Sequence, residues 1–370
     1  MEGTGNLNVD HYRDMKKYLG GVAGNVRRII EEHPLTERLA PAYFKDGVML
    51  YPRRGGKALR PGLLLAAARI MGGEDEGALL VGAAVEMFHI FTLVHDDIID
   101  CDELRRGGPS NHVFFRSILA ARHDLAARSN DQLGEALAIL AGDVQHAFAV
   151  SLITAAARRR LVASDVALHL LDELEVNVLT PLVEGQVLDL MLAAMPLADV
   201  TEDAVTDMLW KKTGVLFQFA LTAGAMIGMG SSDATHPIIA TFTRIGRLFG
   251  IGFQLMDDLL GLLGKKETFG KPIGSDLIEG KRTPIVLHAY DRASNAEKRF
   301  IESILGNPGS TVEQREELTG LLIQLGGPDH ARRRMREHLE QCRELISGLP
   351  AHPMREMLME IAEYAGTRDK

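Results

Sequence analysis

The chain has 370 residues and a formal net charge of −9, with 46% apolar and 25% charged residues. Such a length and composition are those of an ordinary soluble globular protein. The net acidity argues against a general nucleic-acid binder, which usually presents a basic face, so we expect no nucleic-acid partner.

The N-terminal residues and the two cysteines bear on the compartment. The first twenty residues contain no apolar core of the signal-peptide type, and we expect residues 1–12 to form a flexible tail. Cys101 and Cys342 lie far apart and in no metal-ligand spacing, which fits a reducing environment better than a disulfide framework. These features predict a cytoplasmic protein.

Helical periodicity with short Gly or Pro breaks runs along most of the chain, as at "MGGEDEG" (71–77), "MPLADVTED" (195–203) and "GNPGSTVEQ" (306–314). In "PLADVTED", Thr201 is placed to cap a helix. The sequence has no succession of alternating strands, no Gly-rich strand-to-helix turn and no internal repeat. It therefore predicts an all-α fold, with residues 1–370 forming a single large helical bundle domain.

Two helical segments invite other interpretations. Residues 213–232, "TGVLFQFALTAGAMIGMGSS", carry no charge and approach the ~20 residues that span a bilayer. Their many small residues and Gln218 favour a buried core helix instead, so we expect no membrane span. The basic run in "ARRRMREHLEQCREL" (331–345) is typical of a solvated helix face.

Three acids interrupt an apolar helical stretch in "LVHDDIIDCDELRRGGP" (93–109). Asp96 and Asp100 are four residues apart and share a face, where like charges repel. At about 100° per residue, His89 lies within about 20° of Asp96, and Asp97 lies on the flank of this stripe. A positive group is therefore expected between the carboxylates.

A second acidic pair, Asp257 and Asp258, interrupts the apolar segment "FGIGFQLMDDLLGLLG" (249–264), with Gln254 one turn before Asp257. Two such clusters on two helices can face each other across a bundle core. Hard oxygen ligands without His or Cys suit Mg²⁺ rather than zinc. The alternative is that each cluster caps or pairs locally, but neither segment supplies enough Lys or Arg on the same face.

Cations stand beside Gly turns or acid motifs throughout this acidic chain. Together with two metal-binding clusters they indicate a pocket for phosphate oxygens, with apolar helix walls below. Each cation alone is weak evidence, because Lys and Arg are common on surfaces. The set comprises Arg53, Arg54, Lys57, Arg60, Arg105, Arg106, Lys211, Lys212, Lys271 and Lys281.

Seven motifs in this order resemble the polyprenyl synthetase family of trans-isoprenyl diphosphate synthases. They are "GGKALRP" (55–61), "HDDIID" (95–100) followed by "LRRGGP", "LAGD" (140–143), "EGQVLDL" (184–190), "KTG" (212–214), "FQLMDD" (253–258) and "GKPIGSDLIEGKRTP" (270–284). The resemblance implies an all-α transferase, usually a homodimer, that uses Mg²⁺ to condense isopentenyl diphosphate head-to-tail with an allylic diphosphate.

The resemblance also implies residue roles. Metal ions would be held by Asp96, Asp100 and Asp257, with Asp97 assisting and Asp258 and Asp189 in the outer shell. The allylic diphosphate would contact Arg105, Lys212, Lys271 and Lys281, with Thr213 and Gln254 near the carbocation. Isopentenyl diphosphate would be held by Gly56, Lys57, Arg60, His89 and Arg106. The catalytic set is expected to be Asp96, Asp97, Asp100, Arg105, Lys212, Thr213, Gln254 and Asp257.

Two positions depart from the family pattern. The second acidic motif usually has a third Asp where this chain has Gly261, which would weaken the second metal site if that acid mattered. Asp276 in the nearby loop makes the loss tolerable. In "RRGGP", Gly108 stands where Lys is common, which removes one exposed charge.

Product length depends on residues below the first acid cluster. Phe91, with the small Thr92 beside it, resembles the aromatic residue that limits many synthases to a C20 product, and "DDIID" lacks the insertion of the usual bacterial C15 type. On a straight helix, however, Phe91 lies about 140° from Asp96, and Phe88 lies nearer the acid face. Phe88 is therefore a rival stopper, and a purely structural core Phe is the third alternative. We expect geranylgeranyl diphosphate, with farnesyl or C25 and longer diphosphates as alternatives.

Three other function classes remain open. A terpene cyclase would share the acid-rich helix but would not use a second diphosphate site such as "GGKALR". A non-catalytic partner subunit should have lost acids or cations. A metal phosphohydrolase built on His95 and Asp96 would want further His ligands at metal spacing.

Overall fold

The computed structural model describes residues 13–121, 130–264 and 275–368, and the expected tail (1–12) and Lys271 lie outside these ranges. Within them the chain is helical except for loops and one hairpin, in which β1 (Leu104–Arg105) pairs antiparallel with β2 (Gly108–Pro109). The all-α prediction is confirmed. The helices are α1 (Arg13–Glu31), α2 (Pro34–Arg38), α3 (Ala42–Val48), α4 (Leu50–Arg54), α5 (Leu59–Ile70), α6 (Asp75–Ile99), α7 (Asn111–Ala120), α8 (Asn130–Arg158), α9 (Ser164–Asp172), η1 (Glu173–Val178), α10 (Leu179–Ala194), η2 (Leu197–Asp199), α11 (Glu202–Leu209), η3 (Trp210–Gly214), α12 (Val215–Met229), α13 (Pro237–Leu263), α14 (Ser275–Ile278), α15 (Pro284–Arg292), α16 (Asn295–Ile304), α17 (Val312–Gln324), α18 (Gly327–Ser347) and α19 (Pro353–Thr367).

Local sequence signals set several helix starts. Thr201 accepts a hydrogen bond from the backbone N–H of Ala204 and caps α11, as the sequence predicts. Ser294 and Thr311 each form a reciprocal capping box with the third helical residue, Glu297 and Gln314 respectively. These caps satisfy backbone donors that a helix otherwise leaves without partners.

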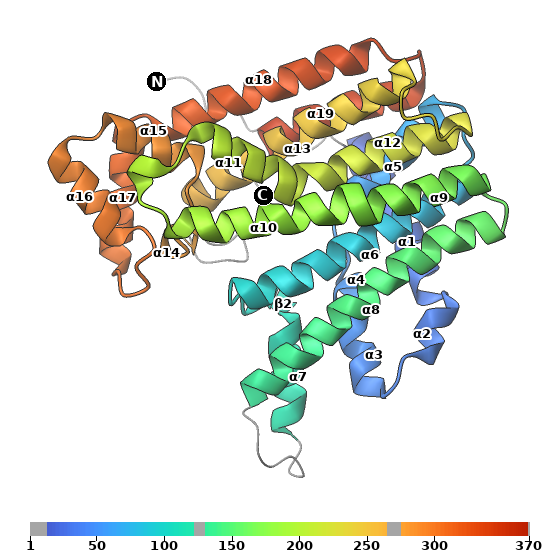
Figure 1. Cartoon of the computed structure of the whole chain (residues 1–370), viewed down its shortest axis with the longest axis horizontal. Helices are drawn as coiled ribbons and strands as arrows, with labels where there is room; N and C mark the ends of the chain where they lie inside the picture. The colour runs from blue at the N-terminus through green and yellow to red at the C-terminus, as the bar shows by residue number, and fades with distance from the viewer. Residues whose placement is uncertain (1–12, 122–129, 265–274, 369–370) are drawn as a thin grey trace.

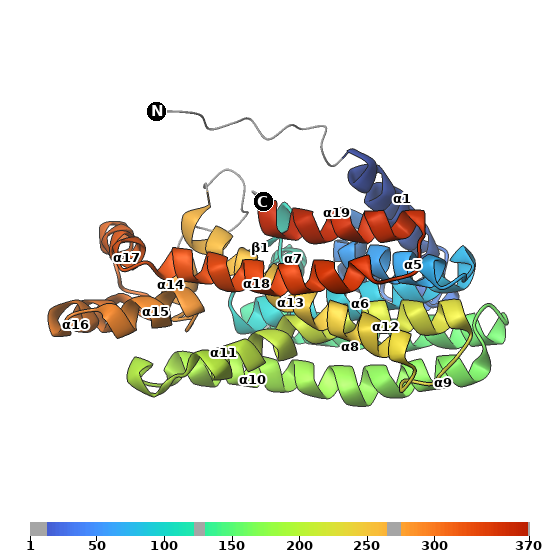
Figure 2. The same ribbon diagram turned by 90° about the horizontal axis from the view of Figure 1, so that it is seen from above.

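The long helices lie side by side, and α6 runs through the middle of the bundle (Figure 1). In the view from above, α9 and α10 form one face and α18 and α19 the opposite one, with α6, α12 and α13 between them (Figure 2). Buried apolar side chains from all these layers form one hydrophobic core. This arrangement brings the acid-bearing ends of α6 and α13 to the same region of the bundle.

The uncharged segment is a core helix, as the sequence predicts. It forms α12, and most of its side chains, including Phe217, Leu221 and Met226, are buried. Its small residues allow close packing against α5 and α13.

Three helical stretches are long and apolar enough to cross a bilayer, judged by length and composition alone. They span Asp75–Ile99, Asn130–Arg158 and Ser164–Ala194, and the shares of their apolar windows buried inside the protein are 72%, 44% and 22%. α6 is therefore a core helix, whereas the α9–α10 stretch keeps an exposed apolar face. The absence of a membrane span stays a prediction.

Candidate active site

A cavity of about 520 Å³ collects most of the residues singled out in the sequence. Its walls come from the loop before α5, from α6, the hairpin, α10, η3 and α13, and from the segment that contains α14. Of the expected site residues, it is lined by Gly56, Lys57, Arg60, His89, Asp96, Asp100, Arg105, Arg106, Asp189, Lys212, Thr213, Gln254, Asp257, Asp258 and Lys281. The two acid clusters thus face each other across one cavity.

The first acidic wall consists of Asp96 and Asp100 at the end of α6. The Nζ atom of Lys212 lies 3.4 Å from an Asp96 carboxylate oxygen and supplies the expected positive group. Burial and the neighbouring Asp96 carboxylate raise the pKa of Asp100 to about 6. The negative charge of these two carboxylates is therefore only partly compensated by the cations of the protein itself.

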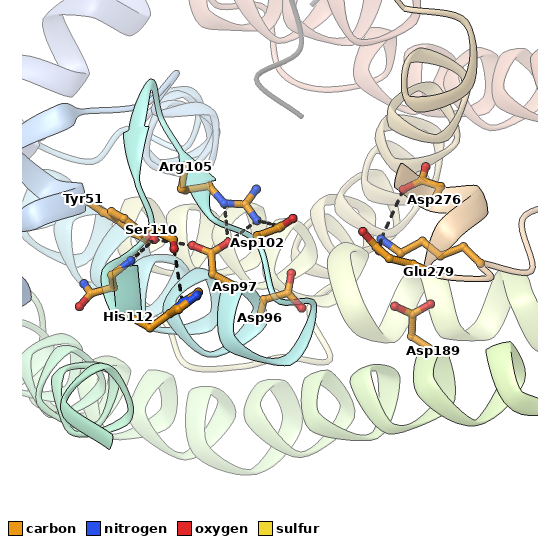
Figure 3. Close-up of polar contacts among 12 residues, drawn as sticks. Tyr51, Asp96, Asp97, Asp102, Arg105, Ser110, His112, Asp189, Asp276 and Glu279 are labelled. Carbon is orange, nitrogen blue, oxygen red and sulfur yellow. Dashed lines mark hydrogen bonds and ion pairs between the residues drawn. The ribbon is translucent and has the colours of Figure 1, made fainter. Parts of the chain in front are cut away.

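Asp97 takes a different position from the one expected, because it lies outside the cavity and is fully buried. Its carboxylate accepts hydrogen bonds from the Tyr51 hydroxyl and from Arg105, whose Nε lies 2.7 Å away. Figure 3 shows Asp97 turned toward Tyr51 and Arg105, away from Asp96. One residue of helix rotation, about 100°, moves its side chain off the acid face. We therefore assign Asp97 to holding Arg105 in place.

Replacing Asp97 by alanine should lower the free energy of unfolding by about 3 kcal/mol, because it removes a buried acceptor from both Tyr51 and Arg105. Asp102, 2.9 Å from Arg105, compensates in part. Urea unfolding measures the change, with Asp96→Ala as the control because the partner of Asp96, Lys212, keeps a second carboxylate. Equal urea midpoints for the two variants would contradict the structural role of Asp97.

The second acidic wall is formed by Asp257 and Asp258 on α13. Gln254 donates a hydrogen bond to Asp258 and accepts one from the Thr213 hydroxyl, at 3.0 and 2.9 Å. Burial, then the nearby Asp276, raises the pKa of Asp258 to about 7. Thr213 and Gln254, which the sequence places on different helices, are therefore one hydrogen-bonded unit above the acids.

Gly261 and Asp276 are close neighbours in space. A Cβ atom added at Gly261 would lie 2.6 Å from a carboxylate oxygen of Asp276, so that carboxylate fills the space next to the glycine. The sequence places Asp276 only in the nearby loop; the structure places its carboxylate at the position where the third acid of the motif would begin.

Lys212 and Lys281 stand between carboxylates at one end of the cavity. Lys212 lies 2.6 Å from Asp189. Lys281 lies 2.7 Å from Glu279 and 3.5 Å from Asp276, two of the acids labelled in Figure 3. Burial opposes the charge of Lys212, but Asp96 and Asp189 outweigh it and hold the lysine pKa above its usual range. Both lysines therefore remain charged and can bind an anion.

Lys212 and Thr213 lie on η3, a π-helical segment. Such widened turns occur frequently at functional sites. The neighbouring Lys211 instead pairs with Glu184 and Asp207 and contributes no wall of the cavity.

A cationic compartment forms another part of the cavity, with Lys57, Arg60, His89 and Arg106 in its wall. Burial lowers the pKa of Arg60 to about 10, so Arg60 remains charged at neutral pH. Burial and then Arg60 and Arg106 lower the pKa of His89 well below its usual range, so His89 is neutral. Lys57 lies 5.8 Å from the ring centre of Tyr364 in α19. These cations can hold an anion, although one acid, Glu86, lines the cavity beside them.

Arg53 and Arg54, which the sequence also suggested as phosphate-binding cations, do not line this cavity. Arg53 pairs with Asp46, and Arg54 donates to the carbonyl oxygens of Arg105 and Pro109, holding the hairpin. Gly108 lies under the Arg54 guanidinium, where a Cβ atom would be 2.7 Å from its central carbon. The glycine thus permits this contact, in addition to removing a charge.

The donor set fits a hard divalent cation shared with a phosphate ligand. Within residues 13–121, 130–264 and 275–368, no three acid, His or Cys side chains are grouped closely enough to hold an ion alone. Asp258 is 7% exposed, and its Oδ2 is buried without a hydrogen-bond partner. Mg²⁺ is commonly bound through one or two carboxylates, with water and substrate phosphate as its other ligands.

A second cavity of about 370 Å³ has mostly apolar walls. Arg60, His89, Leu93, Asp96, Lys212 and Thr213 line both cavities, so they form the boundary between them. Phe91 and Thr92 line the apolar cavity, as does Leu216 of α12. Phe88 is fully buried and lies behind Phe91, with a ring-centre distance of 5.0 Å.

Several residues of the site give no signal in the sequence. Arg368 near the C-terminus is 5% exposed and lies 2.8 Å from Asp257. His146 on α8 packs against Phe91 at a ring-centre distance of 5.3 Å. Tyr51, on α4, holds Asp97. Each belongs to a segment that reads as ordinary core or surface helix, and only tertiary packing brings it here.

His95 does not form a metal site with Asp96. Its Nε2 lies 3.2 Å from the carbonyl oxygen of Ile139 on α8, and its ring packs edge-on against Phe91. This placement argues against the phosphohydrolase alternative.

Comparison with known proteins agrees with this geometry. Residues 43–322 match the polyprenyl synthetase family model. A geranylgeranyl diphosphate synthase of Methanosarcina mazei is 34% identical to this chain, and the alignment covers 85% of this chain and 86% of the relative. A geranylfarnesyl diphosphate synthase of Aeropyrum pernix is 31% identical, and the alignment covers 86% of this chain and 92% of the relative. The crystal structure of a geranylgeranyl pyrophosphate synthetase from Pyrococcus horikoshii aligns with a TM-score of 0.82 and 29% identity, covering 97% of this chain and all of that one. The chain belongs to the polyprenyl synthetase family and is a prenyltransferase.

Proposed function

We propose that the protein condenses isopentenyl diphosphate head-to-tail with allylic diphosphates, using Mg²⁺, with geranylgeranyl diphosphate as the main product. The observation that carries the proposal is the pair of joined cavities. One cavity has acids on two walls and two groups of cations, and it adjoins an apolar space that can take a growing hydrocarbon chain. The related geranylgeranyl diphosphate synthase supports the C20 product, and the related geranylfarnesyl diphosphate synthase keeps C25 as the alternative.

The residues of the first cavity suit ionisation of an allylic diphosphate. Lys212 and Lys281 lie where they can donate hydrogen bonds to the leaving diphosphate. Mg²⁺ bound by Asp96 and Asp100 on one wall and Asp257 on the other would stabilise the charge that develops on this leaving group.

The resulting allylic cation would lie near Thr213 and Gln254, whose joined side chains present oxygen dipoles to it. Leu93 and the apolar cavity exclude water that would quench the cation. The double bond of isopentenyl diphosphate, held in the cationic compartment, then attacks the cation. The proton lost in this step can pass to the released pyrophosphate, so no protein nucleophile is needed.

Incubation of the purified protein with Mg²⁺, isopentenyl diphosphate and a labelled allylic diphosphate tests the proposal. Chain elongation to a C20 diphosphate supports it. A cyclic hydrocarbon would indicate a terpene cyclase, and no turnover would indicate a non-catalytic subunit. The intact cationic compartment argues against both alternatives.

Arg60→Ala should raise the KM for isopentenyl diphosphate at least tenfold and the KM for the allylic substrate much less. Arg60 lies in the cationic compartment, and loss of a buried charged hydrogen-bond donor costs about 1.5–3 kcal/mol. Steady-state kinetics with each substrate varied in turn measures the difference. The reverse pattern would mean that the two diphosphates occupy opposite compartments.

We further propose that two copies associate through the exposed apolar side chains of α8, α9, η1 and α10. Large exposed apolar patches are typical of interaction surfaces. Part of this surface, Val183, Val187 and Leu190, also lines the apolar cavity, so a second copy would close the outer wall of the hydrocarbon site. The surface comprises Ile139, Leu140, Leu168, Val176, Val183, Val187, Leu190 and Met191.

The double variant Leu168→Glu, Met191→Glu should convert the dimer into a monomer in analytical ultracentrifugation, because it places two charges in a buried apolar interface. Val312→Glu, at an exposed apolar side chain on α17, is the control and should remain a dimer. A double variant that stays dimeric would place the interface elsewhere.

A further inference from the structure

A carboxylate lies inside the compartment proposed to bind isopentenyl diphosphate. Glu86 on α6, one turn before His89, is 8% exposed and lines the large cavity together with Lys57, Arg60 and Arg106. An anionic side chain repels a diphosphate, and metal coordination does not explain it, because the acids proposed to hold Mg²⁺ lie elsewhere on α6 and on α13. Its presence among these cations therefore requires another reason.

Glu86 is paired with Arg106. Its Oε1 lies 3.0 Å from Nη2 of Arg106, and Nη1 of the same guanidinium donates to the carbonyl oxygen of Tyr51 at 3.1 Å. The guanidinium packs against Gly56, where a Cβ atom would lie 2.9 Å from Nη2. The side chains of Arg106 and Glu86 are 15% and 10% exposed, so the pair is largely shielded from water. These contacts hold the guanidinium in one orientation.

The backbone of Arg106 also needs support. Arg106 and Gly107 form the two-residue turn between β1 and β2, and both have positive φ, +50° and +74°. For a residue other than glycine this left-handed conformation is unfavourable and persists where surrounding contacts enforce it. The contact with Glu86 ties the strained turn to the rigid helix α6.

Glu86 also acts on a second cation of the same cavity, Arg60. Burial is the main cause that lowers the pKa of Arg60, and the charge of Arg106 lowers it further, whereas Glu86 and Asp257 raise it. Like charges that share a poorly hydrated space repel each other. The carboxylate offsets this repulsion while the compartment is empty.

We propose that Glu86 is a positioning residue for isopentenyl diphosphate: it orients Arg106 and keeps Arg106 and Arg60 together in the empty compartment. The inference rests on the proposed function, since it assigns Glu86 to one substrate of that reaction. It acts through Arg106 and does not touch the reacting atoms.

Calorimetric titration of isopentenyl diphosphate into the full-length protein, with EDTA present so that the metal-dependent wall is not engaged, tests the proposal. Glu86→Gln, which keeps the shape but loses the charge, should weaken binding at least tenfold. The KM for isopentenyl diphosphate should rise in parallel, with kcat and the allylic KM changed less than threefold. The control is Glu76→Gln in the first turn of the same helix, where an exposed Glu pairs with Arg159; its affinity should equal that of the wild type.

A double-mutant cycle with Arg106→Ala distinguishes positioning from other effects. Glu86→Gln should weaken binding no further once Arg106 is absent. An affinity for the single variant that is unchanged, or higher because a repulsive charge has gone, would overturn the proposal. So would an equal loss in the Arg106→Ala background. A wild-type protein that binds no isopentenyl diphosphate would instead refute the proposed function itself.

Discussion

Asp96→Ala and Asp257→Ala should each lower turnover by about three orders of magnitude or more. The two carboxylates stand on opposite walls of one cavity, and each is proposed to hold Mg²⁺ against the leaving diphosphate. Interactions that strengthen as charge develops act on the transition state, and each ~1.4 kcal/mol lost is tenfold in rate. Loss of one metal-binding carboxylate should cost roughly 4 kcal/mol of this stabilisation.

The fold should survive both changes. Without Asp96, Lys212 keeps its ion pair with Asp189, and without Asp257, Arg368 keeps its hydrogen bond to the carbonyl oxygen of Phe253. Steady-state turnover and the far-ultraviolet circular dichroism spectrum measure the two effects separately. Asp207→Ala, which removes a half-buried acid that is paired with Lys211 outside the cavity, is the control and should retain activity. Near-native activity in both variants would refute the two-walled metal site.

The contact between Arg368 and Asp257 offers a second explanation for a loss of turnover in Asp257→Ala. The Arg368 guanidinium lies 2.8 Å from Asp257 and 3.6 Å from the Phe253 ring centre, so it provides a positive charge at this wall. Asp257→Asn, which keeps the shape and a hydrogen-bond acceptor, should lose turnover as severely as Asp257→Ala. Equal loss in both variants assigns the effect to the missing negative charge and not to displacement of Arg368.

Helical periodicity predicts that His89, Asp96 and Asp100 lie on one face of a helix, and all three line the cavity. The same rule put Asp97 on the flank of the stripe, and the structure turns it fully away, into a buried pair with Arg105. The resemblance to a family gave Asp97 a metal-assisting role, whereas its neighbours in space decide what it contacts.

Contacts between distant segments could not be predicted. In the sequence, Glu86 is a single acid in an apolar helix, and only the folded hairpin places Arg106 against it. Arg368 reads as a surface residue until α19 packs beside α13. The π-helical turn that carries Lys212 and Thr213 has no signature in its sequence, because a widened turn depends on packing against neighbouring helices. The contacts of Glu86 and Arg368 and the shape of this turn therefore depend on tertiary structure, whereas the roles of Lys212 and Thr213 are already implied by the family resemblance.

The straight-helix estimate placed Phe88 nearer the acid face than Phe91, yet Phe91 lines the apolar cavity and Phe88 does not. The reason is that the cavity extends around α6: Phe91 and His95 line it from the flank of the helix, and His89, Thr92 and Asp96 line it from the acid face. Residues of α10 and α12 complete its wall. The Phe91 ring is held there edge-on by Phe88, His95 and His146.

Phe91→Ala should therefore lengthen the products beyond C20, because it removes a side chain that a growing hydrocarbon chain would meet and opens the space in front of Phe88 and His146. Phe88→Ala should leave a cavity behind the wall, lower the free energy of unfolding by about 3–5 kcal/mol and change product length little. Mass spectrometry of the dephosphorylated products and urea unfolding measure the two effects. If Phe91→Ala left the distribution unchanged while Phe88→Ala shifted it, the acid-face residues would set the floor of the cavity, and the resemblance to other C20 synthases would fail at Phe91.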